Sequence, residues 1–437
     1  MEKRETFTSK MGFVMACIGS AIGLGNIWMF PYRLGRYGGA AFLIPYLIFV
    51  VILGTTGLMT EFSFGRRFQG GSMTGIVKVF SEKKKRGGKI VGALPAIGLA
   101  GIFMFYNIVV GWILKYLFMS VTGELKKIDK STYFDGFAGT SASIPWNMIA
   151  IIITVLIISL GVTKGIERIS KIIMPALFLI FIALAIRSLT LPGSIEGVKF
   201  LLQPKWSYLG EVNTWVMALG QAFFTVSLNG CGMVVYGSYL KKNYDIPKLA
   251  LTTSLLDTLA ALLASFVIMP AVFAFGVDVN AGPPLLFMTM PSIFDKMPGG
   301  SFIAVIFFIS LLFAAISSSI NMLEGVTEAV ISNLKVQRKK AVLSIGLVMA
   351  VLSIPLNLSM NVFDNFTNLI TVVISPLMVI LVLFVYFYMH DAKNALKEIN
   401  EGSNIRLGGK FLGFAKYGFM FVTILVVILG IVYGGIG

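Results

Sequence analysis

Near its N-terminus the chain reads Cys17-Ile18-Gly19-Ser20-Ala21-Ile22-Gly23-Leu24-Gly25-Asn26-Ile27-Trp28, in the middle of the first apolar stretch. Glycine weakens a helix by about 1 kcal/mol relative to alanine, and this stretch holds three glycines together with a serine and an asparagine. Inside a bilayer, the amides and carbonyls that a break frees must find other partners. The stretch therefore predicts a membrane helix that is interrupted where an ion or a substrate can bind.

A second interruption lies in the sixth apolar stretch, at Ser227-Leu228-Asn229-Gly230-Cys231-Gly232. Interrupted segments at corresponding places in two halves are typical of transporters built from inverted repeats. The positions predict two five-helix halves and one extra helix. Free amides at one half-helix and free carbonyls at the other suit a zwitterion beside a monovalent cation. Glycine also marks close helix packing, and that alternative stays open for either cluster taken alone.

The composition places the chain in a membrane. Of its 437 residues, 57% are hydrophobic and 13% are charged, whereas a soluble domain carries roughly 25% charged and about 45–50% apolar residues. This balance excludes a soluble globular enzyme, a disordered chain and a fibrous protein. His390 is the single histidine, which excludes most histidine-based catalysis and most zinc sites. Cys17 and Cys231 lie in apolar surroundings, so no structural disulfide is expected.

Eleven apolar runs have about the length of a membrane helix. They cover residues 11–33, 39–66, 90–120, 145–163, 168–187, 211–239, 247–276, 300–333, 341–356, 362–389 and 411–434. We expect an all-α polytopic membrane protein in which helices one and six are unwound in the middle of the membrane. The expected domain is a single transporter unit over 1–437, with repeats at about 11–187 and 211–389 and an extra helix at about 411–434. Residues 191–206 and 283–297 are predicted to be re-entrant or surface helices.

The basic residues indicate the orientation of the chain. With the N-terminus in the cytoplasm, 26 of the 36 lysines and arginines fall in cytoplasmic segments. An odd number of spans then places the C-terminus outside the plasma membrane. We interpret the formal charge of +16 as an orientation signal rather than a nucleic-acid footprint. Lipid head-group binding is the alternative for each lysine cluster.

Beyond the first few residues of each predicted span, four acids remain in the membrane, where charge is costly and usually functional. Glu61 either accepts hydrogen bonds from an unwound segment or binds a proton. Asp257 has no lysine or arginine close in sequence, so its expected counter-charge is a bound cation, with a partly solvated structural acid as the alternative. Glu324 and Glu328 lie one turn apart and are expected to line a cytoplasmic vestibule. The hydroxyls of residues 317–319 either bind a small cation or bond back to their own helix.

Four motifs, in order along the chain, resemble those of the neurotransmitter:sodium symporter family, which has the LeuT-type fold. They are Gly23-Leu24-Gly25-Asn26-Ile27-Trp28-Met29-Phe30-Pro31, Gly38-Gly39-Ala40-Ala41-Phe42-Leu43-Ile44-Pro45-Tyr46, Gln221-Ala222-Phe223-Phe224-Thr225-Val226-Ser227 and Phe313-Ala314-Ala315-Ile316-Ser317-Ser318-Ser319. Eleven spans resemble the bacterial branch, whose members include tyrosine and tryptophan transporters. The resemblance implies a sodium-coupled amino-acid symporter that works by alternating access.

The resemblance also implies ligand sets for two sodium ions and an amino acid. The first ion would meet the substrate carboxylate together with Ala21, Asn26, Thr225 and Asp257. The second would meet Gly19, Ile22, Ala314, Ser317 and Ser318. The substrate backbone would meet Ala21, Leu24, Gly25, Tyr106, Phe224, Thr225 and Ser227, and its side chain would meet Ile102, Phe224, Asn229, Gly230, Ser318 and Met322. Glu61 would support the unwound part of span six.

One departure from the family pattern bears on chloride. Asp257 stands where many members carry asparagine, and Ala261 stands where chloride-dependent members carry serine. A fixed carboxylate can supply the negative charge that chloride supplies elsewhere. We therefore expect chloride independence, and Asp257 could release a proton in the return step.

The gates also depart from the pattern. At the outer gate Asp364 matches the family acid, and Arg33 is expected to replace the arginine that is absent at position 29. At the inner gate Arg4 and Phe7 match an arginine and an aromatic residue. Glu328 is expected to replace the acid that is absent at position 332.

The expected substrate is an aromatic or large apolar amino acid, because Gly230 stands where some relatives carry phenylalanine and leaves room for a ring. Tyrosine comes first, since Asn229 and Ser318 could meet a phenol hydroxyl. A sodium- or proton-coupled carrier of another small amine or osmolyte is the first alternative. A membrane enzyme would need clustered histidines, cysteines or paired acids at one depth, and the sequence offers none. Matched broken helices argue against a channel.

Overall fold

The computed structural model describes residues 5–277 and 284–435, and every regular element within these ranges is a helix. In the same ranges, eight helices are long and apolar enough to cross a membrane, and the number is nine when a bent pair near the N-terminus is counted as one span. The eight are Gly39–Phe68, Gly88–Thr122, Ser141–Ser159, Val162–Leu189, Ile246–Ala274, Gly300–Leu334, Met360–Asn400 and Gly409–Val432. This result confirms the predicted all-α membrane class.

Within these spans lie the helices α3 (Leu43–Phe49), α4 (Thr55–Phe68), α6 (Gly88–Thr122), α8 (Ile144–Ser159), α9 (Arg168–Leu189), α13 (Ile246–Ala274), α15 (Gly300–Leu334), α18 (Met360–Asn368), α19 (Ser375–Phe384), α20 (Ala392–Asn400), α21 (Gly409–Gly413) and α22 (Phe419–Val432). The bent pair comprises α1 (Lys10–Ala21) and a second arm, Gly25–Arg36, that contains α2 (Phe30–Arg36). The shorter helices are α5 (Ser72–Glu82), α7 (Tyr133–Phe137), α10 (Ser194–Leu202), α11 (Val212–Thr225), α12 (Gly232–Ser238), α14 (Met290–Lys296), α16 (Arg338–Leu352) and α17 (Ile354–Asn357).

Two predicted spans are not among the long helices, for separate reasons. The stretch 211–239 is divided into α11 and α12, and neither piece is long enough to cross a membrane alone. The stretch 341–356 ends its regular helix at Leu352, and a proline at the start of α17 follows. Proline cannot donate the hydrogen bond that would continue a helix.

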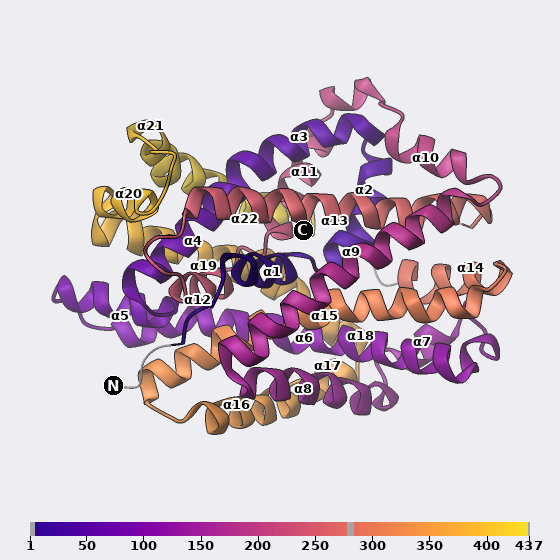
Figure 1. Cartoon of the computed structure of the whole chain (residues 1–437), viewed down its shortest axis with the longest axis horizontal. Helices are drawn as coiled ribbons and strands as arrows, with labels where there is room; N and C mark the ends of the chain where they lie inside the picture. Colours follow the sequence, from indigo (N-terminus) through magenta and orange to yellow (C-terminus); the bar gives the residue numbers. More distant parts are fainter. Residues whose placement is uncertain (1–4, 278–283, 436–437) are drawn as a thin grey trace.

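The predicted connecting helices are short, as their sequences indicate. Residues 191–206 contain α10, and residues 283–297 contain α14, although residue 283 lies outside the described part of the chain. Figure 1 shows α7, α10 and α14 near one end of the molecule, whereas α5, α20 and α21 lie near the other.

Long helices surround the two broken ones. In Figure 1, α6, α9, α13 and α15 run along the length of the molecule, and α1 and α12 lie among them. Helix α15 packs on α6, α9, α1 and α12, while α12 also packs closely on α4. The interrupted segments are therefore enclosed by continuous helices.

The outside of the molecule is largely apolar, unlike the surface of a soluble protein, and its mostly apolar interior also holds polar groups. Leu156, Leu179 and Leu347 are each more than 60% exposed. Asn26 and Asp257 are at most 2% exposed. Lipid is the solvent that suits such a surface, and polar groups at membrane depth are expected to face the interior.

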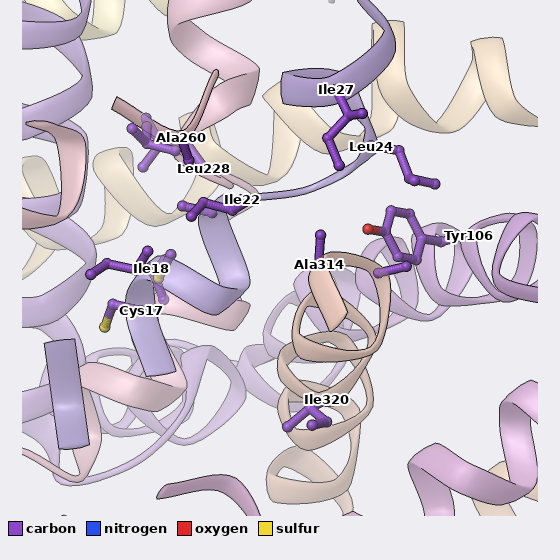
Figure 2. Packing of buried hydrophobic residues seen from close by; sticks show 14 of the residues in the cluster. Cys17, Ile18, Ile22, Leu24, Ile27, Tyr106, Leu228, Ala260, Ala314 and Ile320 are labelled. Carbon is purple, nitrogen blue, oxygen red and sulfur yellow. The ribbon is translucent and has the colours of Figure 1, made fainter. Parts of the chain in front are cut away.

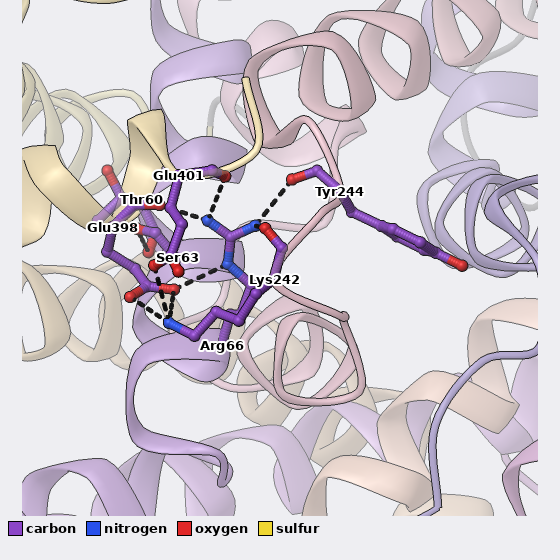
Figure 3. Close-up of polar contacts among 7 residues, drawn as sticks. All are labelled: Thr60, Ser63, Arg66, Lys242, Tyr244, Glu398 and Glu401. Atoms are coloured by element: carbon purple, nitrogen blue, oxygen red, sulfur yellow. Dashed lines mark hydrogen bonds and ion pairs between the residues drawn. The ribbon is translucent and has the colours of Figure 1, made fainter. Parts of the chain in front are cut away.

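A polar cluster joins three segments at the end of the molecule that holds α20 (Figure 3). Arg66 of α4 is 1% exposed, and its guanidinium donates to the Glu398 carboxylate at 2.8 Å and to the Tyr244 carbonyl at 2.8 Å. It also donates to the carbonyls of Glu398 and Glu401. The Lys242 ammonium contacts the same Glu398 carboxylate at 2.6 Å. These contacts thus connect three segments of the chain, namely α4, the connection between α12 and α13, and α20.

Replacement of Arg66 by methionine is expected to destabilise the fold by about 3–5 kcal/mol, because it leaves the Glu398 carboxylate buried with one partner fewer. Thermal unfolding of the purified protein in detergent measures the effect as a fall in the midpoint temperature. The matched control is Arg67→Met, because Arg67 is the exposed neighbour on the same helix. Equal midpoints for the two variants would contradict a stabilising role for the Arg66 cluster.

Candidate ion and substrate site

The first span breaks where its glycines lie. Helix α1 ends at Ala21, the second arm begins at Gly25, and the two arms are bent by 59°. The last regular hydrogen bond of α1 runs from the Ile22 amide to the Ile18 carbonyl at 2.7 Å. The Asn26 side chain then reaches back and accepts from the Gly23 amide at 3.3 Å. The Asn26 backbone amide also donates to the Gly23 carbonyl at 3.2 Å, so the break is closed by this single backbone turn together with the Asn26 side chain.

The sixth apolar stretch breaks between Thr225, where α11 ends, and Gly232, where α12 begins. Two residues of this connection have left-handed backbones, Ser227 with φ of +57° and Gly230 with φ of +71°. The Ser227 hydroxyl donates to the Ser20 carbonyl at 2.7 Å. The two broken segments thus contact each other directly.

Glu61 of α4 contacts the second break. One of its carboxylate oxygens accepts from the amides of Asn229, at 3.2 Å, and Gly230, at 2.9 Å. Its side chain is 2% exposed. The sequence left two roles open for Glu61, which were to accept hydrogen bonds from an unwound segment or to bind a proton. The geometry matches the first role.

Asn229 caps helix α12, a role that sequence reasoning missed. Its side-chain oxygen accepts from the amides of Cys231 at 3.0 Å and Gly232 at 2.8 Å, and its side-chain nitrogen donates to the Ser227 carbonyl at 3.1 Å. Asparagine is a strongly preferred residue at a helix start, and its position three residues before Gly232, where α12 begins, was the available signal. Both ends of this amide have backbone partners, and one N–H of its nitrogen is left for a further contact.

Gly230 does not create space for a substrate ring in this structure. A Cβ at Gly230 would lie 2.5 Å from the Met378 carbonyl oxygen of α19. Together with the positive φ, this close approach explains why glycine stands here. The expectation of an aromatic substrate assumed that Gly230 leaves room for a ring. Gly230 no longer supports that expectation.

The residues predicted for the first ion lie together. The Asn26 amide nitrogen donates to one Asp257 carboxylate oxygen at 2.7 Å and to the Thr225 hydroxyl at 3.1 Å. The Thr225 hydroxyl donates to the other carboxylate oxygen at 2.6 Å. All three side chains are at most 4% exposed, and Ala21 lies buried at the end of α1. A half-turn of the Asn26 amide would exchange its nitrogen and oxygen, and would present an oxygen to a cation beside the carboxylate.

The residues predicted for the second ion also meet. The Ser318 hydroxyl lies 3.2 Å from the carbonyl oxygens of Gly19, Ser20 and Ile22 and 3.3 Å from that of Ala314. A hydroxyl has one proton and can satisfy only one of four acceptors at a time. Oxygen atoms gathered in this way suit a hard cation such as sodium. The Ser317 hydroxyl donates to carbonyls of its own helix at 2.9 Å, as the alternative for these serines anticipated.

The predicted substrate-binding residues surround the first break. Figure 2 shows Tyr106 next to Leu24, with its hydroxyl directed toward the side on which Ala314 lies. The Tyr106 hydroxyl is buried and has no hydrogen-bond partner among the described residues. It lies 3.4 Å from the place where a Cβ of Gly23 would stand. Gly25 is exposed, and a Cβ there would meet nothing within 4 Å.

The remaining lining residues, Ile102, Phe224 and Met322, are half-buried. They come from α6, α11 and α15, which are the helices that enclose the two breaks. Their arrangement leaves apolar side chains beside the polar groups of the unwound segments. This combination suits a ligand that has a charged end and an apolar end.

The predicted outer gate pair is not brought together. Arg33 is 4% exposed, and its guanidinium donates to the side-chain amide oxygen of Gln221 at 3.1 Å. Asp364 lies exposed on α18, and within residues 5–277 and 284–435 it forms no ion pair with Arg33. Arg33 was expected to replace the family arginine that is absent at position 29, one turn away. The Arg33 side chain is instead buried against α11, which explains why it does not reach Asp364.

The inner gate is described in part, because Arg4 lies outside the described residues. Phe7 is fully buried and contacts the rings of Tyr236 and Tyr239 edge-on, at centroid distances of 5.8 and 6.1 Å. The Glu328 carboxylate accepts from the Ser332 hydroxyl at 2.7 Å. Glu328, which was expected to replace the family acid, therefore contacts Ser332, the residue at the position where that acid is absent.

Glu324 does not line a vestibule. Its side chain is fully buried, forms an ion pair with Arg338 at the start of α16, and accepts from the Tyr239 hydroxyl. Sequence reasoning grouped Glu324 with Glu328 because they lie one turn apart. The partner that buries Glu324 comes from the next helix and has no signal in the local sequence.

Comparison with known proteins supports the same interpretation of the fold. The sodium:neurotransmitter symporter family matches residues 4–136 and 132–436. The uncharacterized sodium-dependent transporter YhdH of Bacillus subtilis (strain 168) is 39% identical over 371 residues, which cover 83% of this chain and 81% of the relative. The uncharacterized sodium-dependent transporter MJ1319 of Methanocaldococcus jannaschii is 30% identical over 433 residues, with coverages of 93% and 86%. The crystal structure of MhsT in complex with L-phenylalanine superposes with a TM-score of 0.85 at 35% identity, and covers 98% of this chain and 100% of that one.

Apolar helices that enclose two broken segments and a buried acid define a membrane transporter. The chain belongs to the sodium:neurotransmitter symporter family. The family resemblance of the sequence motifs is thereby confirmed. Dependence on sodium is confirmed as a property of the family. Its relatives are transporters rather than enzymes.

Proposed function

We propose that this protein is a sodium-coupled symporter for aromatic or large apolar amino acids. The observation that carries the proposal is the meeting of Asn26, Thr225 and Asp257 at the two broken segments, with bond distances of 2.6 to 3.1 Å. These three side chains come from three separate helices. Within residues 5–277 and 284–435, Asp257 has no basic partner. A buried acid of this kind, placed beside freed backbone groups, suits a cation that binds together with an amino acid.

We propose two sodium ions and no chloride. The first would lie at Asn26, Thr225, Asp257 and the Ala21 carbonyl, and the second at the carbonyls around Ser318. The Asp257 carboxylate would supply the negative charge near the first ion. Two positive charges that move across 100 mV release roughly 4.6 kcal/mol. That energy supports about a thousandfold accumulation of a zwitterion before the sodium gradient is counted.

We propose that the substrate carboxylate binds the amides of Leu24 and Gly25 and the Tyr106 hydroxyl. The buried, unpartnered Tyr106 hydroxyl and the open space at Gly25 support this placement. The ammonium group would bind carbonyls of Ala21, Phe224 and Thr225. Ser227 is a weaker candidate, because its hydroxyl already donates to Ser20.

The aromatic class rests on apolar lining residues and on the phenylalanine bound by MhsT, a structural relative at 35% identity. Tyrosine is part of this class. Asn229 and Ser318, the groups expected to meet its hydroxyl, have backbone partners of their own. We therefore propose phenylalanine and leucine as ligands at least as good as tyrosine.

We propose that the chain forms one transporter domain of eleven spans in the plasma membrane, with two five-helix repeats and an extra helix. Residues 10–36, 212–238 and 338–357 supply the spans that are bent, broken or short. The N-terminus would be cytoplasmic and the C-terminus external, as the basic residues indicate. Phe7 and Glu328 would then close the cytoplasmic side during alternating access, together with Arg4.

The test measures binding of radiolabelled phenylalanine, tyrosine, leucine and alanine to the purified protein in sodium and in potassium. Saturable, sodium-dependent binding is expected for the first three, with alanine at least tenfold weaker. Replacement of chloride by gluconate is expected to leave binding unchanged. A preference for alanine would overturn the aromatic class, and binding of amines without a carboxylate would favour a carrier of another substrate on the same fold.

A further inference from the structure

The turn between α5 and α6 carries the densest basic cluster of the chain, Lys83-Lys84-Lys85-Arg86-Gly87-Gly88-Lys89. We call its five basic residues the basic turn. All five are exposed, and none forms an ion pair with any residue in 5–277 or 284–435. The neighbouring acid, Glu82, has a carboxylate oxygen 3.4 Å from the His390 ring. The charge of the basic turn is therefore not neutralised within the described chain.

The backbone of the basic turn is held in place by hydrogen bonds. The amides of Lys83, Lys84 and Lys85 donate to carbonyls at the end of α5, at 3.1, 3.0 and 2.8 Å. These bonds occupy the amides and leave the side chains as the groups that can meet a partner. The side chains make no contribution to the packed core, so the fold itself does not require their charge.

An apolar face begins directly after the basic turn. Ile90, Leu94 and Ile97 of α6 are 75%, 41% and 63% exposed. Residues at this spacing share one face of a helix. In a membrane protein such a face meets acyl chains, so the basic turn lies at the depth where the hydrocarbon ends and head groups begin.

The opposite end of the molecule differs. There Lys130 is paired with Asp295, and Lys115 lies 3.6 Å from Glu124. Two of the basic residues at that end are thus matched by acids of the chain. The contrast identifies the basic turn as a surface that lacks an internal counter-charge.

We propose that the basic turn binds the phosphate head groups of anionic phospholipids, while Ile90, Leu94 and Ile97 contact the acyl chains of the same lipids. Clusters of four to eight basic residues next to a membrane helix have this chemistry. Each basic side chain near an anionic surface strengthens binding roughly fivefold. The alternative role of these residues is to orient the chain during its insertion into the membrane. That role requires their positive charge, but it does not require a fixed turn beside an exposed apolar face. The proposal is independent of the transported substrate.

The experiment titrates the purified, full-length protein in neutral detergent with phosphatidylglycerol, with phosphatidylcholine and with inorganic phosphate. Native mass spectrometry counts the lipids that remain bound. The test variant carries Lys83→Gln, Lys84→Gln, Lys85→Gln and Arg86→Gln together. We expect the wild type to prefer phosphatidylglycerol at least tenfold, and the variant to lose that preference. The preference is also expected to weaken in high salt.

Two controls keep the result specific. A charge-conserving variant with Lys83→Arg, Lys84→Arg, Lys85→Arg and Arg86→Lys is expected to retain the preference. Lys126→Gln with Lys127→Gln, at the opposite end, is expected to have no effect. An unchanged preference in the glutamine variant overturns the proposal, and so does an equal loss for both lipids. Competition by inorganic phosphate as strong as by the lipid would assign the turn to free phosphate and would also overturn it.

Discussion

Replacement of Asp257 by alanine is expected to abolish sodium-dependent uptake and to weaken sodium binding about 100-fold. Both carboxylate oxygens have buried donors, Asn26 at 2.7 Å and Thr225 at 2.6 Å. The variant removes the only acid of this cluster and leaves those donors without their acceptor. Loss of one member of a buried charged contact costs roughly 3–5 kcal/mol, and each 1.4 kcal/mol is tenfold in affinity. Equilibrium sodium titration of phenylalanine binding measures the change.

The isosteric variant Asp257→Asn separates charge from shape. It keeps a side-chain oxygen for the ion and removes the negative charge, so a smaller loss of sodium affinity is expected than in the alanine variant. The family resemblance implies that a serine at position 261 accompanies chloride dependence. The double variant Asp257→Asn with Ala261→Ser is therefore expected to acquire chloride-dependent binding. Unchanged uptake by Asp257→Ala would place the first ion site elsewhere.

Local signals predicted the fold well. Apolar runs and glycine clusters are properties of neighbouring residues, so both breaks and the limits of the long spans could be derived from the sequence. Helix α1 ends within the predicted cluster, and α12 begins at Gly232. Spans nine and ten are the exceptions. Pro355 ends the regular helix of span nine early, and the helix of span ten continues to Asn400, beyond the predicted end at 389.

The site depends on contacts between distant segments, and these could be predicted only through the family resemblance. Asn26 and Asp257 are 231 residues apart, and no local pattern joins them. Where the chain departs from the family, neither source was sufficient. Gly230 is explained by the backbone of α19, and Glu324 by an arginine of α16. Asn229 was misinterpreted because a helix cap and a ligand contact use the same side-chain atoms.

Replacement of Ser318 by alanine is expected to remove the second ion while the first is retained. The hydroxyl lies within 3.3 Å of four carbonyl oxygens from α1 and α15, of which only one can receive its proton. The three other carbonyls, with the hydroxyl oxygen itself, form a set of ligands for a small cation. Without the hydroxyl, the affinity for sodium at this set is expected to fall about 10- to 100-fold.

The loss of one of two coupled ions has a signature that a loss of stability lacks. Two sodium ions that bind together with one amino acid make binding rise steeply with sodium concentration. The Ser318→Ala variant is expected to lower that steepness from a Hill coefficient near two to one near unity, whereas Asp257→Ala weakens sodium binding about 100-fold. Ser310→Ala is the matched control, because Ser310 lies on the same helix and bonds only to its own Phe307 carbonyl at 2.6 Å. If Ser318→Ala retained the steep dependence, the carbonyl cluster would serve to pack α1 on α15, and the second ion would bind outside it.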